Sequence, residues 1–183
     1  MNIFLVGFMG SGKTTIGKML AKKLGLSFID LDAAIEKQHG MSVGMIYSTL
    51  GECSLREIER DMLLDLTKNN NQVFSVGGGV ACFFDNIELM NKNGLSIYLK
   101  LSIDTILGRL LSFPPEIRQA RPLLANKTHK QVKNYIETTL VEREPFYNKA
   151  KVIIDCDKLN VDETLKKVEK SIIYNQIPNL TVR

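Results

Sequence analysis

The chain has 183 residues, of which 44% are hydrophobic and 24% charged, values that fit one domain with a full hydrophobic core. Its formal net charge is +4, and no dense basic run with interleaved aromatic residues occurs, so we expect a solvated surface and no nucleic-acid partner. No apolar run approaches the length of a membrane span, so we expect no membrane partner either.

The three cysteines, Cys53, Cys82 and Cys156, are widely spaced and form no CxxC pair. This spacing indicates neither a zinc site nor a disulfide framework, and reduced thiols are typical of the cytosol. The apolar start MNIFLV lacks the basic segment and the cleavage-like site of a secretion signal. We therefore expect a cytoplasmic protein and, because no heptad or apolar stripe argues for assembly, a monomer.

Strands and helices alternate along the sequence. Short apolar runs predict strands, and apolar residues at helical spacing predict helices. In chain order we expect a strand over 2–7, a helix over 13–24, a strand over 26–30, short helices over 33–38 and 43–50, and a longer helix over 52–67. These are followed by a strand over 72–76, a helix over 86–91, a strand over 95–101, helices over 103–111 and 128–143, a strand over 151–156 and a helix over 161–174.

Asp85 and Ser102 precede two of these helices and are expected to cap them. The proline-bearing stretch over 112–124 has no clean period and predicts a loop. The alternation as a whole predicts an α/β fold, with helices on both faces of a mostly parallel sheet, as a single domain over 1–183.

The stretch GFMGSGKT, from Gly7 to Thr14, fits the pattern G-x-x-x-x-G-K-[ST] between a predicted strand and a predicted helix. Glycines let the N–H groups of such a loop point at phosphate oxygens, and the helix adds the positive end of its dipole. Lys13 is expected to reach the β- and γ-phosphates, and the Thr14 hydroxyl to ligate Mg²⁺. The loop predicts binding of ATP or GTP without indicating which molecule accepts the phosphate.

Two charged motifs follow. Asp30 and Asp32 end the second predicted strand, where strand alternation would put both carboxylates on one face beside the phosphate loop. One could hold a metal-bound water and the other could accept the proton of an acceptor hydroxyl, although Asp32 would also serve as a helix cap. Farther on, Arg56, Glu59 and Arg60 share one helix face, which by itself is typical of a solvated ion-pair face.

Three more motifs lie later in the chain. Gly77-Gly78-Gly79 ends the third predicted strand, and consecutive glycines let a backbone approach another group closely. Arg121 stands in the proline-bearing loop, where an arginine could close over a phosphate during its transfer. Arg143, near a helix end, could clamp an acceptor carboxylate with two hydrogen bonds. Taken singly, these motifs also fit a turn, a surface arginine and helix-end charge pairing.

In this order, the motifs G-x-M-G-S-G-K-T-T, D-x-D, GE-x-x-x-R-x-x-E, GGG, RPLL and ER-x-P-x-Y make the chain similar to shikimate kinases over roughly residues 1–150. The resemblance implies a P-loop fold like that of nucleoside monophosphate kinases, with three αβα layers around a five-stranded parallel sheet. It implies a substrate-binding segment over about 32–61 and a lid over about 110–125. It also implies Mg²⁺-dependent transfer of the γ-phosphoryl group of ATP to the 3-hydroxyl of shikimate, on the route to aromatic amino acids.

The resemblance further implies a role for each matching residue. The groups on the nucleotide phosphates and Mg²⁺ would be Gly10, Ser11, Gly12, Lys13, Thr14 and Thr15, with Asp30 in the outer shell of the metal. Arg109 would cover the adenine, with the segment over 157–161 completing its pocket. The groups on shikimate would be Asp32, Arg56, Gly77, Gly78, Gly79 and Arg143, with Asp32 as base. Arg121 would touch both substrates, so Lys13, Asp32 and Arg121 are the expected catalytic residues.

The chain departs from the family pattern at two points. Leu55 stands where the family usually has phenylalanine, and the loop between Arg109 and Arg121 is longer, so Arg118 competes for the lid role. Three alternatives stay open at this stage. A gluconate kinase would lack the combination of GGG and ER-x-P-x-Y, and a nucleoside monophosphate kinase would need a nucleobase pocket after Asp32. A nucleotide-dependent switch would have lost the base or the lid arginine.

Overall fold

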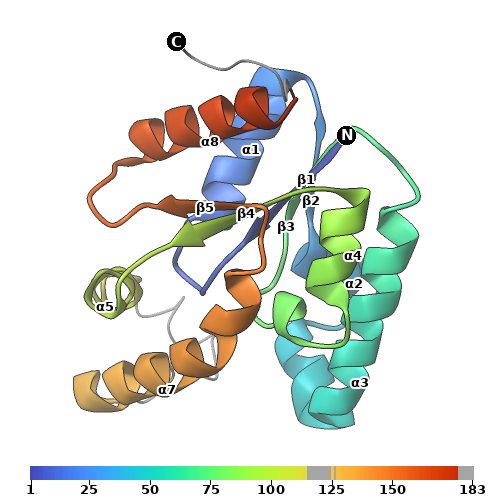
Figure 1. Cartoon of the computed structure of the whole chain (residues 1–183). Coiled ribbons are helices and arrows are strands. Elements are labelled where there is room, and N and C mark those ends of the chain that lie inside the picture. Colours follow the sequence, from blue (N-terminus) through green and yellow to red (C-terminus); the bar gives the residue numbers. More distant parts are fainter. Residues whose placement is uncertain (115–124, 126, 177–183) are drawn as a thin grey trace.

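The computed structural model describes residues 1–114, 125 and 127–176 (Figure 1). Its strands form one five-stranded sheet in the order β2-β3-β1-β4-β5. They are β1 (Asn2–Val6), β2 (Ser27–Asp30), β3 (Gln72–Ser75), β4 (Gly94–Lys100) and β5 (Val152–Asp155). All the pairings are parallel, so the carboxyl ends of the strands lie along one edge of the sheet.

Helices cover both faces of the sheet, which confirms the expected αβα layers (Figure 1). On one face, α1 (Lys13–Leu24) packs on β1, β2 and β3 and against α8 (Val161–Gln176). On the other face, α4 (Asn86–Asn93) packs on β4. Beside β2, α2 (Leu31–His39) packs against α3 (Val43–Leu66), and near the carboxyl end of β4, α5 (Ile103–Leu111) packs against α7 (His129–Tyr147).

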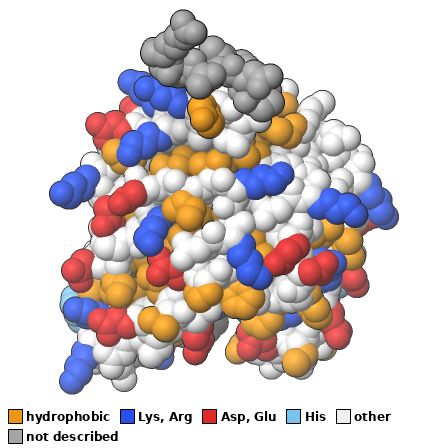
Figure 2. Space-filling model, viewed as in Figure 1, with side chains coloured by type: hydrophobic (Ala, Val, Ile, Leu, Met, Phe, Trp, Pro, Cys, Tyr) orange, Lys and Arg blue, Asp and Glu red, His pale blue; other side chains and the backbone are white. Residues whose placement is uncertain are grey.

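The core forms around β1, in which every residue is buried because helices cover the strand on both faces. Phe4 of β1 and Phe74 of β3 stack with their ring centroids 4.7 Å apart. On the face of the molecule shown in Figure 2, basic and acidic side chains are interspersed. No helix in the described ranges is long and apolar enough to cross a membrane.

The start of α2 corrects the sequence prediction. This helix begins at Leu31, and the carboxylate Oδ1 of Asp30 accepts the N–H of Ala33 at 3.3 Å. Asp30 is therefore the helix cap, and Asp32 lies inside the first turn of α2. The expectation that Asp32 caps the helix, and the expectation that both carboxylates share one strand face, are wrong because the strand ends at Asp30.

Other boundaries differ by a few residues. The helices expected on either side of Gly51 are confirmed: α3 consists of two helices joined by a kink at Gly51, whose φ of 82° and ψ of 173° are not helical. Asp85 precedes α4 without making a side-chain cap hydrogen bond, whereas Ser102 Oγ accepts the N–H of Thr105 at 3.3 Å, as expected.

A 3₁₀ turn, η1 (Val80–Cys82), was not predicted. Helix α7 continues through Pro145, so Arg143 lies inside it rather than at its end.

Gly94→Ala is expected to destabilise the fold. Gly94 begins β4, and a Cβ there would lie 2.2 Å from the carbonyl oxygen of Asn2 in the neighbouring strand. Backbone atoms cannot yield to such a contact, so we expect a loss of about 2 kcal/mol in the free energy of unfolding. Urea unfolding would measure it. The matched control is Gly108→Ala in α5, where nothing lies within 4 Å and alanine should stabilise the helix slightly. Equal effects at the two positions would contradict the steric explanation.

Candidate active site

The phosphate loop joins β1 to α1 at the carboxyl edge of the sheet. Gly10 and Gly12 have φ values of 81° and 95°, which side chains disfavour, so the glycines of the motif are needed for its shape. The Nζ atom of Lys13 donates to the carbonyl oxygens of Gly7 at 2.8 Å and Phe8 at 3.0 Å. The Ser11 hydroxyl is buried without a hydrogen-bond partner in the described part of the chain. The loop thus has the form that the motif predicts.

Three oxygen-bearing side chains meet where α1 begins. Thr14 Oγ1 donates to Asp30 Oδ2 at 3.0 Å and lies 3.1 Å from Ser75 Oγ. Ser75 was not predicted, because its position depends on the register that pairs Asp30 of β2 with Ser75 of β3. Hydroxyl and carboxylate oxygens are ligands that Mg²⁺ prefers, so the donor set fits this metal.

The glycine turn, residues 77–79, lies between β3 and η1, and each of its glycines faces a different charged side chain. A Cβ on Gly77 would lie 2.8 Å from Asp32 Oδ1, and one on Gly78 would lie 3.4 Å from Arg143 Nη1. A Cβ on Gly79 would lie 2.8 Å from Arg56 Nη1. The predicted close approach of this backbone is confirmed, and the groups it approaches are three of the predicted substrate-binding residues.

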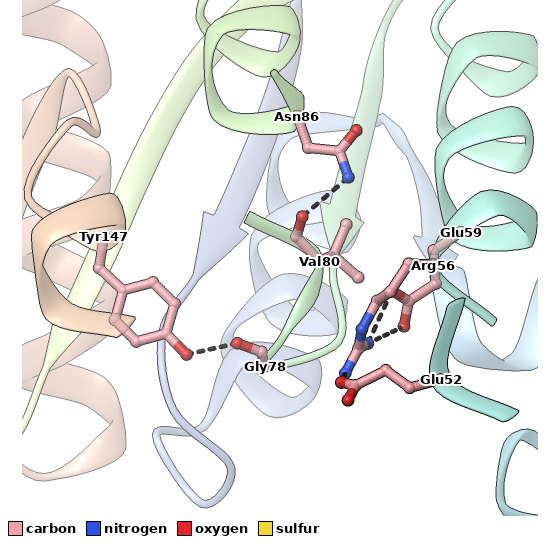
Figure 3. A network of polar contacts seen from close by, with 7 residues as sticks. All are labelled: Glu52, Arg56, Glu59, Gly78, Val80, Asn86 and Tyr147. Carbon is pink, nitrogen blue, oxygen red and sulfur yellow. Dashed lines mark hydrogen bonds and ion pairs between the residues drawn. The ribbon is translucent and has the colours of Figure 1, made fainter. Parts of the chain in front are cut away.

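Arg56 and Glu59 form a buried ion pair on α3 (Figure 3). Arg56 Nη1 donates to both carboxylate oxygens of Glu59 at 2.9 and 2.8 Å, and Nη2 donates to Glu52 at 2.8 Å. Arg56 is 9% exposed and Glu59 only 3%, so the solvated ion-pair face that is typical of such spacing is not what forms here. Burial raises the pKa of Glu59, and the Arg56 charge opposes that rise.

A second set of contacts ties the segment after the glycine turn to α3. Arg60 pairs with Asp85 at 2.6 Å and donates to the side chain of Asn86 at 2.9 Å. Asn86 in turn donates to the carbonyl oxygen of Val80 at 2.8 Å (Figure 3). Arg60 therefore holds η1 and the start of α4 against the helix that carries Arg56. The sequence suggested no role for Asn86, because its partners are distant along the chain.

Helix α7 supplies the other wall of the site. The Tyr147 hydroxyl donates to the carbonyl oxygen of Gly78 (Figure 3). Tyr147 is fully buried, and its burial raises the pKa of the phenol, which keeps it protonated as a donor. One turn earlier, the guanidinium of Arg143 lies 5.9 Å from the ring centroid of Phe8 in the phosphate loop. Arg143 thus stands between the phosphate loop and the glycine turn.

Asp32 is half-buried beside these groups. Burial, and then the neighbouring Asp30 charge, raise the pKa of its carboxyl, while Lys13 and Arg56 oppose the rise. A carboxylate with a raised pKa is a stronger base than an ordinary aspartate once it is ionised. Its position between the phosphate-loop lysine and Arg56 suits a group that acts on a hydroxyl next to a phosphate.

The nucleotide side is described only in part. Arg109 Nη1 donates to the carbonyl oxygen of Gly10 at 3.2 Å, which places Arg109 over the phosphate loop. In the segment 157–161, Asp157 accepts the N–H of Ser102 at 2.6 Å and so joins that segment to α5. The predicted lid arginine, Arg121, and its competitor Arg118 lie outside the described residues.

The cysteines differ in exposure, and each is a free thiol. Cys82 is half-buried behind the glycine turn, and burial raises the pKa of its thiol to about 11. Cys156 is buried at the end of β5, and burial raises its pKa to about 11 as well. Cys53, on α3, is exposed.

A phosphate loop, a half-buried carboxylate and converging arginines at the carboxyl edge of a parallel sheet define a P-loop kinase that phosphorylates a small molecule. The protein-family model described as shikimate kinase matches residues 9–173 of this chain. A shikimate kinase from Parabacteroides distasonis is 40% identical over 171 residues, which cover 93% of this chain and 96% of that protein. The chain belongs to the shikimate kinase family.

Solved structures agree with this assignment. Shikimate kinase from Bacteroides thetaiotaomicron matches with a TM-score of 0.87 at 36% identity, covering 94% of this chain and 98% of that one. Shikimate kinase from Acinetobacter baumannii, in complex with shikimate, matches with a TM-score of 0.83 at 31% identity, covering 96% and 94%. The chain is therefore an ATP-dependent shikimate kinase with the expected nucleoside monophosphate kinase-like P-loop fold, and the alternatives considered from sequence are set aside.

Proposed function

We propose that the glycine turn, residues 77–79, is the floor of the shikimate site and that the phosphate loop holds ATP beside it. The observation that carries this proposal is that the three glycines face Asp32, Arg143 and Arg56, one each. A small anion with several hydroxyls needs cationic groups for its carboxylate and an acceptor for a hydroxyl proton. Because the glycine turn has no side chains, the two arginines and the Asp32 carboxylate can all face it.

In this proposal, Arg56 and Arg143 bind the shikimate carboxylate. Arg56 is held by Glu52 and Glu59, so little side-chain entropy is lost when it binds an anion. Its Nε is buried and has no acceptor in the described ranges. Arg143, on α7, approaches from the opposite wall, beside Gly78.

Asp32 is the base in this proposal. It takes the proton of the 3-hydroxyl as the oxygen forms a bond to the γ-phosphorus of ATP and the bond from that phosphorus to the bridging oxygen of ADP breaks. Lys13 and the N–H groups of Gly10, Ser11 and Gly12 stabilise the charge on the phosphate oxygens. The chemistry is mostly positioning and charge neutralisation, which the rigid sheet edge supplies.

Kinases of this kind generally use Mg²⁺, and the side-chain oxygens of Thr14 and Asp30 fit this ion: Thr14 would hold it directly and Asp30 would act in its outer shell. When bound, Mg²⁺ neutralises charge on the β- and γ-phosphates. Thr15 follows in the first turn of α1, where its N–H faces the phosphates. Arg109 covers the adenine, because its guanidinium already lies over the loop at Gly10.

The remaining assignments concern the chain as a whole. We propose one domain over 1–183, with a substrate-binding segment over about 32–61 and a lid over about 110–125 that carries Arg121 and excludes water during transfer. We also propose that the enzyme acts as a monomer in the cytoplasm, where its substrate ATP is available.

The glycine turn gives a position-specific test. Gly79→Ala should displace Arg56 and raise KM for shikimate about tenfold, whereas Gly77→Ala should displace Asp32 and lower kcat about tenfold. Neither glycine has a positive φ, so alanine adds only its methyl group. Coupled ADP release would measure both constants, with and without shikimate. Both variants should keep the KM for ATP, and identical kinetic defects in the two would contradict the proposed division of roles.

A further inference from the structure

We propose that Phe83 is a positioning residue for Arg56, holding its guanidinium at the angle that receives the shikimate carboxylate. The Cζ atom of Arg56 lies 4.3 Å from the centroid of the Phe83 ring, well within the range of a cation–π contact. Phe83 is half-buried and directly follows η1, so it belongs to the same short segment as the glycine turn. This inference rests on the proposed role of Arg56.

The segment that carries Phe83 is held in place on both sides of this residue. Before it, the N–H of Cys82 donates to the carbonyl oxygen of Gly79 at 2.9 Å and closes the 3₁₀ turn. After it, Asp85 and Asn86 are bound by Arg60, which stands one helical turn beyond Arg56 on α3. The segment that carries Phe83 is thus fixed to the helix that carries Arg56, and the contact between ring and guanidinium is part of a rigid arrangement.

The Phe83 ring contributes a cation–π attraction that Glu52 and Glu59 do not provide. Glu52 and Glu59 accept hydrogen bonds from Nη2 and Nη1, which lie at the edge of the guanidinium plane. The Phe83 ring attracts the cation through its π-system, and so resists displacement of the guanidinium. It does so without a formal negative charge. A third carboxylate at this point would repel the shikimate carboxylate, whereas an aromatic ring leaves the site attractive to anions.

Phe83→Leu tests this role. We expect KM for shikimate to rise about three- to tenfold, the range that a cation–π contact supports, with kcat and the KM for ATP unchanged within about twofold. Phe83→Tyr keeps the π-system and should therefore leave KM for shikimate at the wild-type value. Phe84→Leu is the matched control, because the neighbouring Phe84 is 59% exposed and its replacement should leave all constants unchanged. A lowered melting temperature with a rise in both KM values would show a merely structural role and overturn the proposal.

A double-mutant cycle with Arg56→Met separates this inference from the proposed function. If the ring acts through the guanidinium, Phe83→Leu has no further effect on KM in the Arg56→Met background. The same rise in both backgrounds would overturn the inference and leave the role of Arg56 intact. An Arg56→Met variant with an unchanged KM for shikimate would instead overturn the proposed carboxylate site, and the inference with it.

Discussion

Asp32→Asn is expected to lower kcat at least about a hundredfold and, at neutral pH, to raise the melting temperature. Removal of a general base costs about two to four orders of magnitude in rate. The gain in stability arises because burial and Asp30 raise the pKa of the Asp32 carboxyl, so its ionised form destabilises the folded state. If Asp32 is the base, as we propose, the site keeps a charge that activity needs at a cost in stability.

The direction in which this stability difference changes with pH follows from the raised pKa of the Asp32 carboxyl. Well below the ordinary aspartate pKa of 3.8, Asp32 is protonated in both folded and unfolded chains and costs nothing; the penalty grows as pH rises from there through the higher pKa of the folded state. The melting temperatures of wild type and Asp32→Asn should therefore converge on acidification and separate toward neutral pH. In the wild type, kcat should begin to fall, on acidification, at a higher pH than an ordinary aspartate would give.

The matched control is Asp65→Asn. Asp65 is 73% exposed, and its replacement should change neither kcat nor the melting temperature appreciably. Melting curves across pH would check the change in stability, and coupled ADP release would check the change in kcat. An Asp32→Asn variant that is inactive and also less stable than the wild type at neutral pH would contradict the electrostatic account.

Glu59→Ala is expected to destabilise the fold by about 3 kcal/mol and to weaken shikimate binding. Removing one partner of a buried ion pair leaves the other charge uncompensated. Arg56 is 9% exposed and would be left with Glu52 as its remaining partner among the described ion pairs. Urea unfolding would measure the free energy, and coupled ADP release would measure KM.

Glu52→Ala provides the comparison, because it removes the other partner of the same arginine. Glu52 is 47% exposed, so we expect a loss below about 1 kcal/mol. The double variant Arg56→Met/Glu59→Leu, which removes both buried charges, should recover much of the stability while KM for shikimate stays high. If Glu52→Ala and Glu59→Ala were equally destabilising, burial would not be what sets the cost.

The layers and the phosphate loop could be predicted because their signals are local. The five strands are short apolar runs, and the loop glycines stand directly between β1 and α1. The burial of the Arg56–Glu59 ion pair could not be predicted from such local signals. Their spacing is the same on an exposed helix, and their burial depends on segments distant in the chain, such as the glycine turn that faces Arg56.

Two further features of the site were not predicted. A difference of two residues in the start of α2 moved Asp32 from the strand into a helix and gave the cap to Asp30. Ser75 and Asn86 came to the site through strand register and a contact between distant segments. Arg121 and the lid lie outside the described residues, and their roles stay predictions.

The unequal exposure of the cysteines gives the enzyme a built-in attachment point. Cys82 and Cys156, whose thiols have pKa values of about 11, remain protonated at neutral pH and react slowly with alkylating reagents. Cys53 is exposed and lies one helical turn before Arg56 on α3. A maleimide dye should therefore attach there without mutagenesis, and its fluorescence could follow shikimate binding in real time.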